Sequence, residues 1–293
     1  MNLSALATIA FAVFAPGQNS RAPADPLHGP PFVSCKAWAI LDAKSGALLY
    51  GEKADQPIHM ASTTKIMTCH LIVQLAAKNP AILDETVVVS KRADDTIGSS
   101  AEIKTGDKIP VCELLFGMML PSGNDASVAF AEHFGARFEG AEGDSLAKFI
   151  AAMNRRAKAL GLAETSYVNP HGLTHKDHHS SPRDLGKLAQ VALQDPLFAK
   201  IVNTPRHQGT ALGADGKERK IEWKNTNELL KTEGYFGVKT GTTEAAGACL
   251  VSAGRRGEDS LLVVVLGSAG SAARYSDARN LFRWGWLQRG QAK

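Results

Sequence analysis

The chain has 293 residues, of which 44% are hydrophobic and 21% are charged, and its net charge is +4. These values are ordinary for a soluble globular protein, so they exclude a disordered or fibrous chain. The sequence holds no run of Lys or Arg, which argues against a surface that follows the phosphates of a nucleic acid. We therefore expect no nucleic-acid partner.

The first 31 residues predict an export signal followed by a linker. Residues 3–15 form an apolar stretch, and residues 18–31 form a loose segment that contains proline. The stretch is shorter than the ~20 apolar residues that span a bilayer, which suits a secretory signal, although no Lys or Arg precedes it. We expect a secreted protein in the periplasm or cell envelope. Any membrane attachment would be through an uncleaved N-terminal segment.

The remaining residues, 32–293, predict an α+β domain with strands at both ends of the chain. Strands are expected at 37–41, 46–50, 85–90, 236–238, 248–252 and 261–266. Helices are expected at 62–77, 111–119, 124–134, 146–160, 184–193 and 273–287. The economical topology is a mostly antiparallel sheet that is built from both ends of the chain and flanked by helices. An all-helical subdomain is inserted at about residues 90–200.

Four cysteines leave the disulfide status open. Cys35, Cys69, Cys112 and Cys249 are widely spaced and form no CxxC pair, which argues against a metal site. In an oxidising compartment they could form two bridges, in any of three connectivities. Buried free thiols are the simpler interpretation for at least two of them.

A cluster of histidines raises the question of a metal. The cluster holds His171, His175, His178 and His179. Gly172 lies inside this segment and a proline follows it, so no regular helix fixes a face of ligands, and zinc sites depend on better-defined spacing. We expect no metal and no other cofactor.

Three short motifs occur in order along the chain: Ser62-Thr63-Thr64-Lys65, Ser122-Gly123-Asn124 and Lys239-Thr240-Gly241. Each motif is weak by itself, because residues 145–148 also fit S-x-x-K and residues 104–106 also fit K-T-G. Order along the chain and local structure distinguish the three motifs from these chance matches. The 104–106 string precedes the Ser-Gly-Asn motif, and the 145–148 string begins an ordinary amphipathic helix.

The first motif fits nucleophilic catalysis. Three residues apart on a helix, Ser62 and Lys65 lie on the same face. A serine needs a base to take its proton, and a lysine amine is a base only when burial or a neighbouring positive charge lowers its pKa. Lys239 could supply that charge. The alternative is that Ser62 only caps the helix, which is the usual role of such a serine.

The motifs and their surroundings resemble the D-alanyl-D-alanine carboxypeptidases, the low-molecular-mass penicillin-binding proteins of serine peptidase family S11. The matching segments are residues 61–68, 120–126, 167–173, 183–185, 225–230 and 237–243. The resemblance extends from about residue 34 to 288 and implies a fold like that of the serine β-lactamases and DD-peptidases. Many members carry a C-terminal β-rich domain with a membrane-anchoring helix. Too few residues follow Arg283 here, so we expect neither.

The resemblance also implies a role for each site residue. Ser62 would attack the bond between two D-alanines, and Lys65 would be its base. Ser122 would relay a proton to the leaving amine, and Asn124 would bind the substrate amide and orient Lys65. Lys239, Thr240, Gly241, Thr242 and Arg274 would form the substrate-binding set, in which backbone N–H groups of Ser62 and Thr242 hold the oxyanion. For Arg274, an ordinary surface arginine is the alternative.

The implied enzyme is a penicillin-sensitive hydrolase that removes the terminal D-alanine of peptidoglycan stem peptides, with β-lactam antibiotics as covalent inhibitors and a role in cell-wall biogenesis and cell shape. A DD-endopeptidase of the same family, a serine β-lactamase and a peptidoglycan-binding pseudoenzyme are the alternatives. A class A β-lactamase needs a further glutamate, and Glu164 is the only acidic candidate in the right region. Residues 164–169 resemble the peptidase segment better. A pseudoenzyme would lack a catalytic group, and none is missing.

Overall fold

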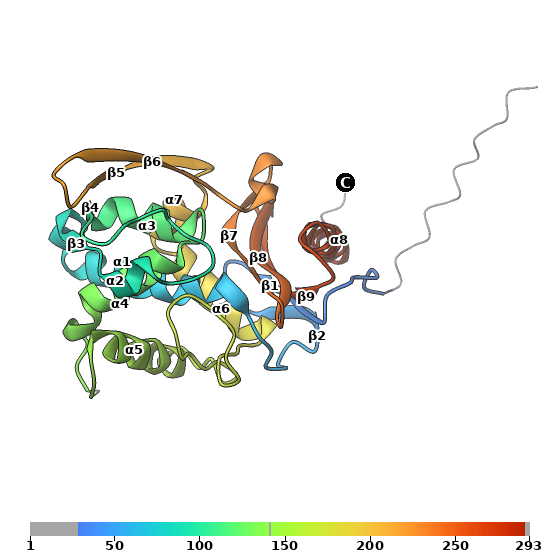
Figure 1. Cartoon of the computed structure of the whole chain (residues 1–293). Helices are drawn as coiled ribbons and strands as arrows, with labels where there is room; N and C mark the ends of the chain where they lie inside the picture. The colour runs from blue at the N-terminus through green and yellow to red at the C-terminus, as the bar shows by residue number, and fades with distance from the viewer. Residues whose placement is uncertain (1–28, 141, 291–293) are drawn as a thin grey trace, which may run out of the picture. The chain divides into compact units, whose positions relative to one another are not determined.

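The computed structural model describes residues 29–140 and 142–290 (Figure 1). The predicted leader at 1–31 lies almost entirely outside these residues. The body described below begins at Pro31. Among the described residues, no helix combines the length and the apolar character that crossing a bilayer requires.

A five-stranded antiparallel sheet joins the two ends of the domain, as predicted. Its strands are β1 (Ala37–Asp42), β2 (Leu48–Glu52), β7 (Tyr235–Thr243), β8 (Gly247–Arg256) and β9 (Asp259–Ser268). They lie in the order β2-β1-β9-β8-β7, so the first strand of the chain pairs directly with its last one. The strand β7 therefore lies at an edge of the sheet.

Alternation along the strands separates the two faces of this sheet. On β1, Trp38 and Ile40 belong to one buried cluster, which includes side chains of α8 (Ala273–Gln288), whereas Ala39 and Leu41 belong to the larger core. The helix α6 (Pro182–Leu193) packs on β1 and β9, and α8 packs on β8 and β9 (Figure 1). The sheet thus buries both faces, as expected for strands of nearly continuous apolar residues.

The inserted part of the chain is mainly helical. Its helices are α1 (Lys65–Lys78), α2 (Lys91–Asp94), α3 (Val111–Met119), α4 (Asn124–Phe134), α5 (Ser145–Ala159) and α7 (Pro196–Val202). The helix α1 contacts α3, α4, α5, α6 and α7, and every residue from Lys65 to Val73 is buried. A helix surrounded on all sides can hold a lysine away from water, which matters for the site below.

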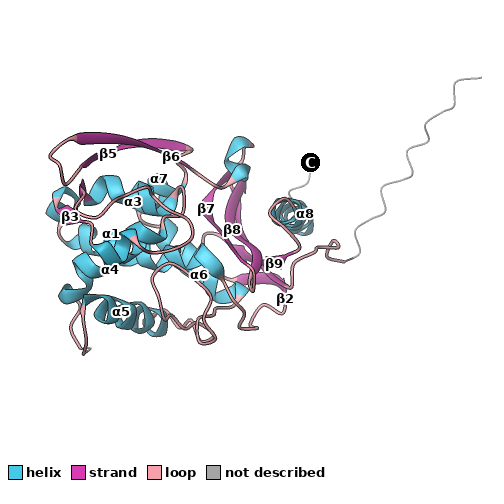
Figure 2. Cartoon of the chain, in the orientation of Figure 1, coloured by secondary structure: helices cyan, strands magenta, loops and turns pink. Residues whose placement is uncertain are grey.

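A second antiparallel sheet, which the sequence analysis did not predict as a whole, lies beside these helices (Figure 2). It contains β3 (Thr86–Val88), β4 (Lys108–Pro110), β5 (Arg206–Leu212) and β6 (Glu218–Lys224) in that order. Only β3 was expected. On β6, Ile221 and Trp223 are buried and their neighbours are exposed, so β6 is polar on one face and its apolar signal is weak.

Candidate active site

Ser62 and Lys65 lie at the start of the central helix. The 3₁₀ turn η1 (Ala61–Thr64) leads directly into α1. The distance from Lys65 Nζ to Ser62 Oγ is 3.1 Å, so the two side chains share a face as the spacing predicted. Ala61 has φ of +48°, a conformation that side chains rarely adopt and that occurs often at functional turns.

Lys65 is fully buried and held by three contacts. Besides Ser62 Oγ, its Nζ lies 2.7 Å from Asn124 Oδ1 and 2.8 Å from the His171 carbonyl oxygen. Burial lowers the pKa of the Lys65 amine well below its usual value, and the positive charge of Lys239 lowers it further. Asp125 opposes the shift without cancelling it. At a given pH the Lys65 amine is therefore neutral, with a free lone pair, more often than an exposed lysine amine is.

The Ser122-Gly123-Asn124 motif forms the turn that leads into α4. Ser122 has φ of +72° and is buried, and among the described residues its hydroxyl has no hydrogen-bond partner. The Asn124 backbone N–H donates to Ser99 O at 2.7 Å, and its Nδ2 donates to Ile97 O at 2.8 Å. Those bonds turn Asn124 Oδ1 toward Lys65. A buried hydroxyl without a partner is uncommon in folded proteins, and a catalytic role is one explanation for it.

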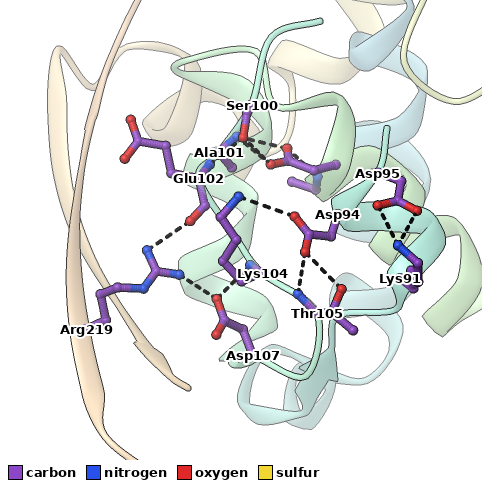
Figure 3. A network of polar contacts seen from close by, with 12 residues as sticks. Lys91, Asp94, Asp95, Ser100, Ala101, Glu102, Lys104, Thr105, Asp107 and Arg219 are labelled. Atoms are coloured by element: carbon purple, nitrogen blue, oxygen red, sulfur yellow. Dashed lines mark hydrogen bonds and ion pairs between the residues drawn. The ribbon is translucent and has the colours of Figure 1, made fainter. Parts of the chain in front are cut away.

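Asp125, which the sequence analysis did not single out, fixes the loop that holds Asn124. Its carboxylate accepts from the Ala101 backbone N–H at 2.8 Å and from Ser100 Oγ at 2.6 Å. From the other side, Trp223 Nε1 of the second sheet donates to Ala101 O at 2.8 Å. Figure 3 shows Ser100 and Ala101 in this network. Asp125 was inside a recognised motif, but its partners are distant in sequence, so only the fold reveals them.

The strand β7 brings the third motif against Ser62. A Cβ added at Gly241 would stand 2.7 Å from the Ser62 backbone nitrogen, so only glycine permits this approach. Lys239 is buried, and burial together with the charge of Arg274 lowers the pKa of its amine to about 7. Thr240 Oγ1 lies 2.7 Å from Thr226 Oγ1. The three predicted motifs are thus brought together around one point.

Arg274, at the start of α8, belongs to the same site. Its Nη1 donates to Thr242 Oγ1 at 2.9 Å and to Gly241 O at 3.2 Å. The residue is only 8% exposed, and within the described part of the chain its Nε has no partner. Arg274 is therefore buried against β7 and does not lie on the surface, and its role in binding substrate stays a prediction.

The histidine-rich segment supports the helix start. His171 supplies a carbonyl oxygen to Lys65, and a Cβ at Gly172 would stand 2.0 Å from Ala61 O. The His178 ring accepts from Val168 N at 3.1 Å through Nδ1, and its Nε2 lies 2.7 Å from Thr64 Oγ1. Burial lowers the pKa of both rings to about 3, so they are neutral at pH 7. Over the described residues, no group of three or more His, Cys, Asp or Glu side chains is arranged to hold a metal.

The two strings that imitate the motifs lie elsewhere. Lys104 and Thr105 contact Asp94 on an exposed loop (Figure 3), and Ser145 and Lys148 belong to the first turn of α5. The positions of residues 104–106 and 145–148 in the fold therefore distinguish them from the three motifs, as the order along the chain did. The four cysteines, all in described residues, are free thiols, and Cys69 and Cys249 are buried.

The family model for D-alanyl-D-alanine carboxypeptidases, family S11, matches residues 25–270. The chain belongs to this family. It is 34% identical to the D-alanyl-D-alanine carboxypeptidase of Streptomyces sp. strain K15 over 94% of both chains. It is 32% identical to the carboxypeptidase DacF of Bacillus subtilis, over 86% of this chain but only 62% of that one.

Solved structures that are similar to this chain include DD-peptidases. The crystal structure of the Streptomyces K15 DD-transpeptidase has a TM-score of 0.81 and 35% identity, covering 88% of this chain and 99% of that one. The D-alanyl-D-alanine carboxypeptidase DacD of Francisella tularensis has a TM-score of 0.77 at 26% identity. The expected DD-peptidase fold is confirmed, and the chain is a serine-peptidase-family hydrolase.

Proposed function

We propose that the protein is a penicillin-sensitive D-alanyl-D-alanine carboxypeptidase that works through an acyl-enzyme on Ser62. The observation that carries this proposal is the contact of Ser62 Oγ with the buried Lys65 amine, which Asn124 and His171 hold in place. A neutral amine has two N–H groups and one lone pair. The two carbonyl oxygens take the N–H groups, which leaves the lone pair for the proton of Ser62.

The covalent step then follows from these positions. Ser62 Oγ bonds to the carbonyl carbon of the D-Ala-D-Ala peptide bond while Lys65 takes its proton. Backbone N–H groups of Ser62 and Thr242 stabilise the oxyanion. The C–N bond breaks as Ser122 passes its proton to the leaving amine, which departs as D-alanine, and Ser122 takes in exchange the proton held by Lys65. Water then cleaves the ester and restores Ser62.

We assign binding of the terminal carboxylate to the positively charged side chains of the site. Lys239 and Arg274 carry the charge, and the hydroxyls of Thr240 and Thr242 lie on the same strand. The pKa of Lys239 is about 7 without a ligand, and a bound carboxylate raises it, so substrate binding itself favours the charged form. Penicillin presents a carboxylate and a strained amide to the same groups.

The substrate and location follow from this chemistry. Peptides that end in D-Ala-D-Ala belong to peptidoglycan, so we place the enzyme outside the cytoplasmic membrane, exported by the predicted leader. We also propose that residues 32–293 form the catalytic domain and that its helical subdomain spans about residues 90–200. A role in cell-wall biogenesis and cell shape follows from trimming these peptides.

Transpeptidation is a second candidate, because the similar Streptomyces K15 structure is described as a DD-transpeptidase. In that reaction an amine, rather than water, attacks the Ser62 ester. Both reactions share the acylation step. Adding glycine as an amine acceptor to the assay distinguishes hydrolysis from transpeptidation, because only transpeptidation joins the glycine to the peptide.

The experiment that tests the proposal is labelling with fluorescent penicillin, followed by measurement of adduct lifetime and D-alanine release. We expect a long-lived adduct that Ser62→Ala abolishes while the thermal unfolding transition remains. Acylation of Ser62→Ala would refute the nucleophile. Fast turnover of penicillin would indicate a β-lactamase, cleavage of cross-links without D-alanine release would indicate an endopeptidase, and absence of both adduct and turnover would indicate a pseudoenzyme.

A further inference from the structure

A short loop connects the second sheet to the active site. It comprises residues 97–102, and we call it the bridging loop. The carbonyl oxygens of Ile97 and Ser99 accept hydrogen bonds from Asn124. Asn124 Oδ1 in turn lies 2.7 Å from Lys65 Nζ. A shift of the bridging loop would therefore move Asn124 relative to the Lys65 amine.

Two side chains of β6 hold the other end of the bridging loop. Trp223 Nε1 donates to Ala101 O at 2.8 Å. Arg219 Nη1 donates to Glu102 O at 2.9 Å, as Figure 3 shows. Residues 219 and 223 are four apart on a strand, so their side chains lie on the same face of β6. That face is the one that carries the buried residues of the strand, so the sheet holds the loop from its inner side.

The Trp223 ring is fixed in place by close packing. Gly117 of α3 and Gly209 of β5 lie against it, and a Cβ added at these positions would stand 2.9 and 2.3 Å from ring atoms. The His207 ring on the paired strand is parallel to it, with 6.1 Å between the centroids. Trp223 is only 2% exposed. Because the ring cannot turn, its N–H has a fixed direction, and the position of Ala101 follows the position of β6.

Ala101 also ties the bridging loop to the catalytic turn. Its backbone N–H donates to the Asp125 carboxylate at 2.8 Å, and Ser100 Oγ donates to the same carboxylate at 2.6 Å. Asp125 directly follows Asn124 at the start of α4. One residue is thus bonded to β6 through its carbonyl and to α4 through its N–H. A displacement at the carbonyl reaches Asn124 across a single residue.

We propose that Trp223 is a positioning residue for acylation: its indole N–H fixes the bridging loop, so that Asn124 holds Lys65 against Ser62. Arg219 supports the same loop through Glu102. This inference rests on the proposed function and adds to it a residue that acts on the reaction only through Ala101 and Asn124.

The test is a double-mutant cycle, measured by stopped-flow acylation with fluorescent penicillin. Trp223→Phe keeps an aromatic ring and removes the N–H. We expect its acylation rate constant to fall about tenfold, which is less than the roughly hundredfold that a displacement of 1 Å can cost. Asn124→Ala removes the residue through which Trp223 acts. In the Asn124→Ala background, Trp223→Phe should therefore change the rate constant by less than about twofold.

A matched control is Trp286→Phe, which makes the same substitution in the buried cluster beneath α8. Among the described residues the Trp286 N–H has no hydrogen-bond partner, so this variant should be acylated at the wild-type rate. If Trp223→Phe does not fold, Arg219→Lys takes its place in the cycle. It keeps the charge beside Asp107 but loses the guanidinium fork that reaches Glu102 O. It should slow acylation by a smaller factor, again only when Asn124 is present.

Thermal unfolding shows which variants are folded. A wild-type acylation rate in folded Trp223→Phe would overturn this inference and leave the proposed function standing. An equal loss in the wild-type and Asn124→Ala backgrounds would overturn it too, because a general weakening of the fold acts in both. If the wild-type protein itself formed no adduct, the proposed function would fail, and this inference with it.

Discussion

Gly241 and Ser62 lie so close together that residue 241 has no room for a side chain. The Cβ of an alanine there would stand 2.7 Å from the Ser62 nitrogen and 3.0 Å from the Ala61 Cβ. The first obstacle is backbone, which cannot move aside as a flexible side chain can. One glycine thus sets the separation between β7 and the turn η1 that carries Ser62.

Gly241→Ala should therefore separate β7 from Ser62. A misplacement of 1 Å can cost about a hundredfold in rate, so we expect penicillin acylation to slow by about that factor. Overpacking should lower the free energy of unfolding by about 1–3 kcal/mol. Stopped-flow acylation and chemical denaturation measure the two effects. Gly270→Ala, at a position with no atom near the added Cβ, is the control and should change neither.

Lys65→Met should abolish acylation while the protein remains folded. General-base catalysis contributes about 10²–10⁴-fold, and methionine keeps the volume of the buried chain while removing the lone pair. The rate of fluorescent-penicillin labelling measures the loss. Lys148→Met, in the string that imitates the motif, should label at the wild-type rate. An unchanged rate in Lys65→Met would remove this residue as the base.

The pH dependence of acylation should respond in opposite directions to two neighbours of Lys65. Acylation requires the neutral amine, so the acidic limb of the rate profile follows the pKa of Lys65. Asp125 raises that pKa and Lys239 lowers it. Asp125→Asn should therefore move the acidic limb to lower pH, and Lys239→Gln should move it to higher pH. Shifts in the same direction in both variants would contradict this assignment.

Lys239→Met should stabilise the fold at low pH. The pKa of Lys239 is about 7 in the folded protein and about 10.4 when exposed, so the unfolded chain binds more protons between these values. The buried lysine therefore lowers the free energy of unfolding of the wild type most below pH 7, by roughly a few kcal/mol. The gain from Lys239→Met should shrink as pH rises from 7 toward 10. Urea denaturation measures it, and the exposed Lys220→Met should show no such trend.

Local sequence determined most of the elements that place the site. The helix predicted at 62–77 is found as η1 and α1, the helices at 111–119 and 124–134 have the predicted bounds, and the five-stranded sheet joins both chain ends. The three motifs identified Ser62, Lys65 and Asn124, because chemistry that needs a serine and a base at fixed spacing leaves a pattern along the chain. Apolar periodicity and turn residues are local signals, so they can be read without the fold.

Tertiary structure alone decided the rest. The strands β5 and β6 have one polar face, so their apolar signal is weak. They pair with each other across a short turn, and β5 joins β4 from a much earlier part of the chain. Asp125, Trp223 and the carbonyl of His171 act through partners far away in sequence. The resemblance predicted Arg274 as a site residue, but its contact with β7 is visible only in the fold. The pKa of Lys65 depends on burial and on the distance to Lys239, and these quantities exist only when the chain is folded.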